Sequence, residues 1–494
     1  MEKKATVAQS IILLLVSISA IIAYSPSING GYFCDDYQFK FHDIKIDLKS
    51  VFTPSHIYAY RPVEKLFLAI MQQNFPQSTW PIHTTLLLLH LMLSALLMVW
   101  LRREGFTRSS SIIAFTVMVL SQANTYAVSS LDTFSQITST LFGYSSIVFF
   151  LGFIRKESNI RYFLYAGSII LSLFAVFCKE NAMFIVPILF ALVLIFHLKH
   201  KSDYQSRLIP LLISLIPYLI ICIVFMLIRK HLNLMPAEIG PGKFNIGLGP
   251  NILKNFFMSL VQAIQPHSSV DLYLDIANNR WLNVAVVLFT SAFLVIITIR
   301  GIFISRLRNF SLVIIALLPL SMFPVILLNE INELYVYNMM PLVAILLGIG
   351  FEETYNHLNH RFLKKGLLCF FSGFLIWNSV SVHSKCRLMK ENGIKSEQIH
   401  RQIDPYYSQI PERGALILVN PNTSKKTEYS IFKRTGFRVV QFGGEEFVRR
   451  SGRNDFRLQI IMENQLDSID TSNSLVLRYK DGIVGKIGSP GNQR

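Results

Sequence analysis

The stretch IHTTLLLLHLMLSALLMVWLRR, residues 82–103, decides the fold of this chain. Positions 83–101 contain no acidic residue, lysine or arginine, and Arg102 and Arg103 follow at once. A run of about twenty mostly apolar residues is long enough to cross the hydrocarbon core of a bilayer. We therefore expect a membrane-spanning helix here, with its basic end in the cytoplasm.

The rest of the chain repeats this pattern. Of the 494 residues, 52% are hydrophobic and only 16% are charged, whereas a soluble domain carries about 25% charged residues. The sequence predicts an α-helical polytopic membrane protein with about eleven transmembrane helices. We expect these helices near 9–24, 83–101, 110–130, 136–154, 162–178, 182–198, 208–228, 281–299, 310–328, 335–351 and 366–382.

The net charge of +17 lies largely in short basic clusters between the apolar runs. Such clusters mark cytoplasmic loops, so the charge does not indicate a nucleic-acid partner. Lys3 and Lys4 precede the first predicted helix, and further clusters follow every second helix. This alternation predicts a cytoplasmic N-terminus and a C-terminal segment on the opposite face. A bacterial inner membrane with a periplasmic C-terminal domain fits, although a protein of the endoplasmic reticulum obeys the same rule.

Three long segments are expected on the outer face, at about 25–82, about 229–280 and about 383–494. The first two contain apolar residues at helical spacing, one set behind Pro62 and one set before Pro266. These stripes are too short to span a bilayer and predict helices that lie in the membrane interface. Covering the helix bundle is a simpler role for them, and the two roles are compatible.

The composition changes after residue 382, so we place a transmembrane domain at 1–382 and a small α/β domain at 383–494. Apolar runs in the second domain shorten to the length of strands and are separated by Pro, Gly, Asn and charged residues. The predicted strands are GALILVN at 414–420, RVVQF at 438–442, RLQIIM at 457–462 and SLVLRYK at 474–480.

Asp35 and Asp36 lie side by side in GGYFCDDYQF, residues 30–39, soon after the first predicted helix. Two carboxylates at a membrane surface could take the proton of an acceptor hydroxyl or hold a divalent metal against a phosphate. A solvated turn after Gly30 and Gly31 is the simpler interpretation. No third ligand is evident in the sequence, so the metal stays open and no other cofactor is indicated.

Two further candidates lie between this pair and the second predicted helix. Arg61, in YAYRP, directly precedes a helix start, where a guanidinium and free backbone N–H groups could bind a phosphate. An anchor to lipid headgroups is an equally simple role. His83 and His90 are seven residues apart and so lie on one helix face. Buried, hydrogen-bonded histidines are the commoner outcome, and only His83 is close enough to the helix end to contact a substrate.

The remaining candidates lie at other helix ends on the same predicted face. Lys179 and Glu180, in FCKENAMF, could contact a phosphate and a sugar or metal, or could form an ordinary surface ion pair. Glu330 and Glu333, in LLNEINELYVYN, place two more carboxylates at this boundary. Arg229 begins the second outer segment and could either bind a phosphate or anchor that segment.

These motifs and their order resemble the GT-C superfamily of polytopic glycosyltransferases, most closely its protein O-mannosyltransferase-like and tetratricopeptide-bearing transmembrane members. The resemblance covers about residues 1–350. The motifs that carry it are DD at 35–36, YRP at 60–62, IHTTLLLLHLMLSALL at 82–97 and CKENAMFIVP at 178–187. The chain departs from the family pattern in three places. Thr85 and Leu86 replace an Asn region, Leu334 replaces a common Arg, and no tetratricopeptide repeats follow.

The resemblance implies a hexosyltransferase that moves a sugar from a polyprenyl-phosphate-linked donor to an acceptor hydroxyl on the outer face. One aspartate of the pair would act as the general base, and Lys179, Arg61 and Arg229 would bind the lipid phosphate. The acceptor could be a protein, a glycan or a lipid. Two other classes remain. A transporter or lipid flippase would line a path through the membrane with charges, and a non-catalytic scaffold would only present the outer domain.

Overall fold

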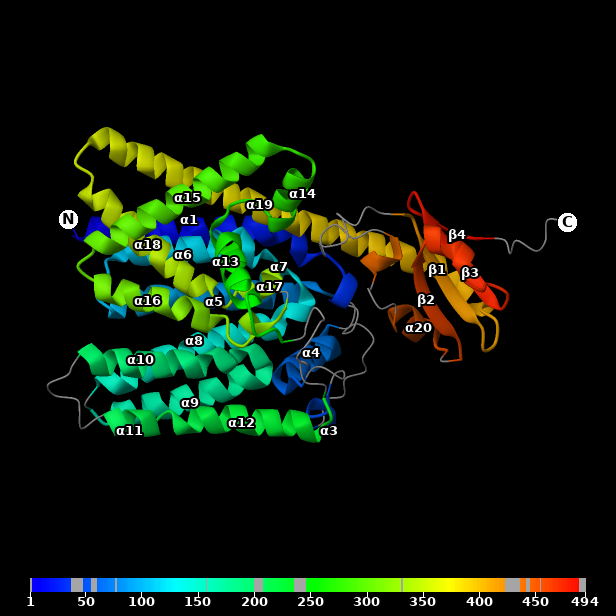
Figure 1. Cartoon of the computed structure of the whole chain (residues 1–494), viewed down its shortest axis with the longest axis horizontal. Helices are drawn as coiled ribbons and strands as arrows, with labels where there is room; N and C mark the ends of the chain where they lie inside the picture. Colours follow the sequence, from blue (N-terminus) through cyan, green and yellow to red (C-terminus); the bar gives the residue numbers. More distant parts are fainter. Residues whose placement is uncertain are drawn as a thin grey trace.

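The structure is a computed structural model in which the chain forms a long helical bundle with a small sheet at one end (Figure 1). The N-terminus lies at the opposite end of the bundle, which we call the N-terminal end; the other is the sheet end. The structure describes residues 2–36, 48–54, 60–75, 78–156, 158–199, 208–234, 246–329, 332–422, 436–440, 445–453 and 455–487.

Helices make up most of the first four hundred residues. The α-helices are α1 Glu2–Ile28, α3 Leu48–Val51, α4 Pro62–Asn74, α5 Trp80–Arg103, α6 Arg108–Leu120, α7 Thr125–Ser129, α8 Phe134–Arg155, α9 Ile160–Cys178, α10 Ile185–Lys199, α11 Leu208–Ile213, α12 Ile216–His231, α13 Asn251–Ile264, α14 Ser269–Ala277, α15 Trp281–Ile304, α16 Arg308–Ser321, α17 Glu333–Val336, α18 Met340–His357 and α19 Arg361–Ile403. Short 3₁₀ turns include η1 Cys34–Asp36, η2 Gln122–Asn124, η3 Leu131–Thr133, η4 Glu180–Phe184 and η6 Val325–Leu327.

A helix occupies every position where a span was predicted, but the predicted number of spans is not confirmed. Among the described residues, seven helices are long and apolar enough to cross a membrane. An eighth results if α6 and the η2–α7 segment, which bend by 48° at their junction, count as one span. The other three predicted spans coincide with α10, α16 and α18, and the apolar stretches around α10 and α16 are shorter.

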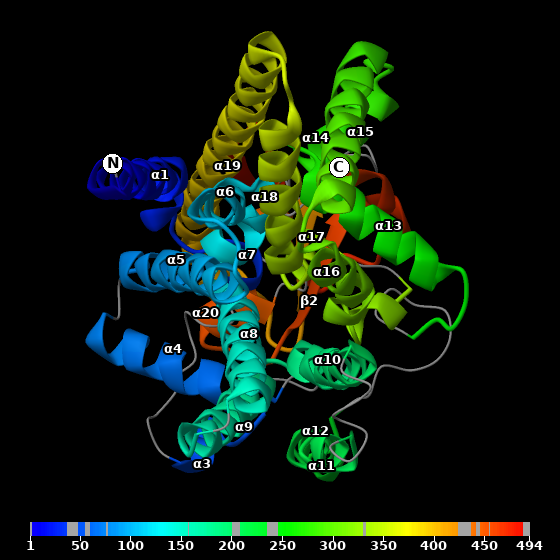
Figure 2. The same cartoon turned by 90° about the vertical axis from the view of Figure 1, so that its left-hand side faces the viewer.

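The two predicted interfacial helices form α4 and α13. Both run across the direction of the long helices, as the end-on view shows (Figure 2). Pro62 occupies the first turn of α4, where its missing N–H costs nothing. Leu253, Phe257 and Val261 of α13 are exposed on one face. An exposed apolar stripe on a helix of this length suits the boundary between lipid and water.

Helices α15 and α18 approach so closely that their backbones touch. A methyl group added to Gly301 of α15 would overlap the backbone of Gly350 in α18, and one added to Gly350 would overlap Thr298. Glycines allow this distance because they place no side chain in the contact. The two helices are therefore locked together near the N-terminal end.

Helix α19 does not end where the composition changes. It continues without a break past residue 383 to Ile403, so the predicted domain boundary falls inside a helix. Its buried positions beyond that point include Lys385, Met389 and Gly393, which recur at helical spacing. The part of the chain that forms the sheet is therefore preceded by an extension of a bundle helix.

The sheet contains four strands in the order β2-β1-β3-β4. β1 pairs in parallel with β2 and β3, and β4 pairs with β3 in the antiparallel sense. Three predicted strands are confirmed, but the prediction for RVVQF is wrong in its described part, because Gly436–Val439 form a 3₁₀ turn that buries Phe437. The sequence analysis also missed β4. The strands are β1 Ala415–Asn420, β2 Arg457–Met462, β3 Ser474–Lys480 and β4 Ile483–Lys486, and helix α20 is Glu445–Ser451.

Candidate functional site

Asp36 follows α1, whose far end from the N-terminus lies toward the sheet (Figure 1), and its side chain is completely buried. It links the turn after α1 to the turn before α8. Its Oδ1 accepts hydrogen bonds from the backbone N–H of Leu131 (2.8 Å), the backbone N–H of Asp132 (3.2 Å) and Ser130 Oγ (3.1 Å). Its Oδ2 has a weaker contact with the backbone N–H of Phe33 at 3.5 Å.

The surroundings of Asp36 shift its pKa upward. Burial raises the pKa of Asp36, the nearby carboxylate of Asp132 raises it further, and the hydrogen bonds act in the opposite direction. Asp132 itself is half-buried. Asp35 belongs to the same 3₁₀ turn, η1, but its side chain lies outside the described part of the structure. Of the predicted acidic pair, the structure therefore describes the side chain of Asp36 only.

Arg61 precedes α4 and binds two carboxylates. Its Nη2 and Nε lie 3.2 Å and 3.4 Å from the two carboxylate oxygens of Glu180, and its Nη1 lies 3.7 Å from Glu64. Glu64 is buried and accepts a hydrogen bond from the backbone N–H of Ser135 at 3.2 Å. Burial raises the pKa of Glu64 in spite of Arg61. The sequence analysis missed Glu64, although its position three residues after Arg61 places both on one helix face.

Two more cations adjoin Glu180. Arg229 Nη1, at the end of α12, lies 3.9 Å from Glu180 Oε2. Lys179 lies in the turn between α9 and η4, is only 4% exposed, and places its Nζ 5.5 Å from the centre of the Tyr335 ring. Burial lowers the pKa of Lys179 to about 8, and the positive charge of Arg61 contributes. Nearby carboxylates offset part of this shift.

We call this group of five side chains the cationic cluster; its members are Arg61, Glu64, Lys179, Glu180 and Arg229. Three cations and two carboxylates leave a formal surplus of one positive charge, and more when Glu64 is protonated. The structure thus brings together four residues that the sequence analysis proposed from three separate segments. Asp132 interacts electrostatically with both Lys179 and Asp36, which connects the cationic cluster to the buried aspartate.

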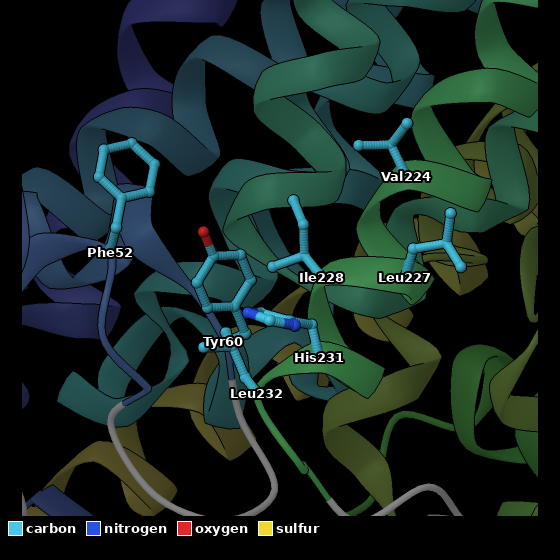
Figure 3. Close-up of a pocket in the computed structure, with 7 residues that line it drawn as sticks. All are labelled: Phe52, Tyr60, Val224, Leu227, Ile228, His231 and Leu232. Carbon is cyan, nitrogen blue, oxygen red and sulfur yellow. The ribbon is translucent and has the colours of Figure 1, made fainter.

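An open apolar cavity of about 420 Å³ is lined by residues that precede two members of the cationic cluster in the sequence (Figure 3). Arg61 directly follows its lining residue Tyr60, and Arg229 directly follows its lining residue Ile228. The cavity opens beside α12, whose residues Val224 and Leu227 are largely exposed. We call it the apolar groove; its lining residues are Phe52, Tyr60, Val224, Leu227, Ile228, His231 and Leu232.

The other predicted site residues that the structure describes lie outside the cationic cluster. Glu333 is buried and forms an ion pair with Lys385 of α19. His83 is buried, and neither of its ring nitrogens has a hydrogen-bond partner within the described residues. His90 bonds to the Tyr337 hydroxyl at 2.8 Å, which is the structural role expected of it. Glu330 lies outside the described residues.

The carboxylates around Asp36 bear on whether a metal ion could bind there. Within the described ranges, no group of three or more His, Cys, Asp or Glu side chains could hold a metal. Asp36 and Asp132 supply two carboxylates, and Oδ1 of Asp36 is already engaged by three donors. A metal bound between Asp36 and Asp132 would need a further ligand, such as Asp35.

No model of a known protein family matches the sequence, and no curated protein matches it significantly. Solved structures similar to this chain include ArnT from Cupriavidus metallidurans in the apo state. It shares 14% identity with a TM-score of 0.49, over 96% of this chain and 94% of that chain. The form of ArnT bound to undecaprenyl phosphate matches over the same shares, with 12% identity and a TM-score of 0.46.

An oligosaccharyltransferase from Archaeoglobus fulgidus, tethered with an acceptor peptide containing the NVT sequon, is also similar. It shares 10% identity with a TM-score of 0.47, over 83% of this chain and 61% of that chain. All three TM-scores lie below 0.5.

Proposed function

We propose that this protein is a membrane glycosyltransferase that moves a hexose from a polyprenyl-phosphate-linked donor to an acceptor hydroxyl. The reaction takes place at the sheet end of the bundle, which faces the periplasm if the basic clusters mark the cytoplasmic side. The N-terminus is then cytoplasmic and the C-terminal sheet periplasmic. The acceptor is a protein, a glycan or a lipid that carries a free hydroxyl.

One observation carries the proposal: Tyr60 and Ile228, which line the apolar groove, directly precede Arg61 and Arg229 of the cationic cluster. A lipid phosphate needs a positive site at headgroup depth, and its hydrocarbon chain needs an apolar surface that starts at the same point. Arg61 and Arg229 flank the groove in sequence and supply the positive charge. Lys179, buried behind them, adds a third cation that would stabilise the departing phosphate.

The reaction would be a substitution at the anomeric carbon of the donor sugar. The acceptor oxygen forms the new bond to this carbon as the bond from carbon to phosphate oxygen breaks. The phosphate leaves with the electron pair of the broken bond, and an aspartate takes the proton of the acceptor hydroxyl. A well-placed general base typically raises the rate about a hundred- to ten-thousand-fold.

Within the acidic pair, we assign the base to Asp35 and the anchoring of the turn to Asp36. A base has to meet the acceptor hydroxyl at hydrogen-bond distance. Asp36 is completely buried and three donors already bind its Oδ1. These features suit a residue that fixes the η1 turn against the turn before α8, and they leave proton transfer to its neighbour.

The two other classes of function explain less of what is described. A transporter needs charges along a path at mid-membrane, but the cationic cluster and Asp36 gather at one end of the bundle. A scaffold gives no reason for burying Lys179 among a second cation and two carboxylates. If variants that lack the Asp35 and Asp36 carboxylates kept lipid transport or envelope assembly intact, one of these alternatives would be favoured.

The proposal is tested by mass spectrometry of cell-envelope proteins, glycans and lipids. Cells that contain the gene are compared with cells from which it is deleted. We expect one class of hexose-bearing product to disappear when the gene is deleted and to stay absent when Asp35→Asn is supplied instead. Arg103→Lys, at the N-terminal end of the bundle, serves as the control and should restore the product. Identical envelopes in all strains would disprove a glycosyltransferase.

A further inference from the structure

One face of α19 contacts the elements around Asp36, and Lys385 is one of the residues that make these contacts. Its side chain is only 3% exposed. Its ammonium group forms an ion pair with Glu333 and donates to Gln122 through the backbone oxygen (3.1 Å) and Oε1 (2.6 Å). A buried ammonium is tolerated only when its charge and its donors are satisfied in this way. Lys385 therefore joins α19 to both η2 and α17.

The next residue of α19 reaches the turn that binds Asp36. Cys386 is buried, and its Sγ lies 3.2 Å from Ser129 Oγ at the end of α7. Ser129 directly precedes Ser130, whose hydroxyl donates to Asp36. Lys385 and Cys386 thus hold the two ends of the η2–α7 segment that leads to the donors of Asp36.

Two turns further on, Gly393 of α19 packs against the start of the η1 turn. A methyl group on Gly393 would overlap the carbonyl oxygen of Gly30, and Gly31 next to it has a positive φ of 71°. Neither position tolerates a side chain without movement of the backbone. Gly30 and Gly31 connect α1 to the turn that contains Asp35 and Asp36, so α19 also fixes this side of the acidic pair.

The last turns of the same helix carry the sheet. Gln402 accepts a hydrogen bond from the backbone N–H of Val484 at 2.6 Å and donates to the carbonyl of Gly482 at 3.1 Å. The buried ring of His400 lies 5.4 Å from the ring of Phe447 in α20. The sheet is thus attached to the helix that contacts both segments around Asp36.

From these contacts we propose that Lys385 and Gly393 are positioning residues for the Asp35–Asp36 turn, and that α19 couples the sheet to this turn. The effect of this coupling on turnover rests on the proposed function. The positioning of the turn by α19 does not depend on it. Displacement of a reacting group by about 1 Å can lower a rate by about 100-fold. A small change on this face of α19 is therefore expected to lower turnover without weakening donor binding.

Gly393→Ala tests the proposal, with Gly373→Ala as its matched control. Gly373 lies on the same helix, and a methyl group added there meets nothing within 4 Å. Full-length protein in lipid nanodiscs is compared by amide hydrogen exchange and by transfer from an undecaprenyl-phosphate-linked hexose. For Gly393→Ala we expect faster exchange in residues 30–36 and 130–133, unchanged exchange in 415–420, and about a 100-fold lower kcat at an unchanged donor KM.

The double variant Lys385→Met with Glu333→Leu provides an independent test if Gly393→Ala does not fold. It removes both charges of the buried pair, so it leaves no unpaired charge behind. We expect the same loss of turnover, with thermal unfolding of the protein like that of the wild type. The proposal would be overturned if the variant that folds, Gly393→Ala or the double variant, showed the same amide exchange and the same kcat as Gly373→Ala. Faster exchange in these segments with no transfer by any protein, wild type included, would uphold the positioning role and reject the glycosyltransferase.

Discussion

Arg61 forms two hydrogen bonds with Glu180, a residue 119 positions later in the chain, through Nη2 at 3.2 Å and Nε at 3.4 Å. The pairing connects the start of the interfacial helix α4 to the turn after α9. It also fixes the position of a guanidinium whose side chain is 19% exposed. An arginine held in this way can turn its remaining N–H groups to a phosphate at little entropic cost.

Arg61→Lys should therefore weaken donor binding. Lysine keeps the charge but cannot form the paired contact with Glu180, so we expect the donor KM to rise about tenfold with a small change in kcat. Titration with an undecaprenyl-phosphate-linked hexose measures this effect. Arg155→Lys is the control, because Arg155 forms a similar double contact with Glu104 away from the cationic cluster. Equal effects of both substitutions would contradict a role of Arg61 in the site.

The two aspartates should respond differently to amidation. Asp36→Asn keeps an oxygen for the donors at Leu131 and Asp132, so we expect normal folding and a moderate loss of turnover. Asp35→Asn should lower kcat about a hundred- to ten-thousand-fold, as for loss of a general base. Single-turnover assays on the purified variants separate the two cases. A larger loss of kcat for Asp36→Asn than for Asp35→Asn would make Asp36 the general base. Normal transfer by both variants would show that the acidic pair takes no part in the reaction.

Donor binding should depend on pH through Lys179. Its pKa is lowered to about 8, so the ammonium loses its proton as the pH rises through that value. The donor KM of the wild type should therefore increase between about pH 7 and pH 9. Lys179→Arg keeps its charge throughout this range, so its KM should stay nearly constant. The same rise in both proteins would assign the pH dependence to another group.

Filling the apolar groove should discriminate against long-chain donors. Leu227→Trp adds bulk to the wall of a cavity of about 420 Å³, so we expect about a tenfold higher KM for an undecaprenyl donor. A donor with a two-isoprene chain should be affected much less. Ile223→Trp is the matched control, since Ile223 is exposed on the same helix but does not line the groove. Chain-length preference that is unchanged by Leu227→Trp would place the hydrocarbon elsewhere.

Local patterns in the sequence predicted most elements of the fold. Apolar runs of sufficient length coincide with helices, because a helix satisfies its own backbone groups within lipid. The polar half of α19 was misread, since its composition changes at the membrane boundary while its backbone does not. β4 was missed because Ile483–Lys486 is a four-residue strand beside a turn, and it acquires its partner only when β3 is in place.

The candidate site shows a similar limit. Arg61, Lys179 and Glu180 could be proposed because charges at helix ends in an apolar chain are conspicuous. Glu64 and Lys385 could not, because each looks like an ordinary polar position of an amphipathic helix. Their burial follows from contacts with Ser135 and Glu333, which are far away in the sequence. Pairings of this kind depend on tertiary packing and leave no local pattern.

The backbone contact between Gly301 of α15 and Gly350 of α18 bears on how a long lipid could reach the cationic cluster. A hydrocarbon tail needs a gap about as wide as a methylene chain, and two helices that touch at their glycines leave none at that crossing. Diffusion from the bilayer between α15 and α18 is therefore closed at that crossing. Among the described residues, the exposed side of α12, where Val224 and Leu227 face outward, offers a route for lateral entry.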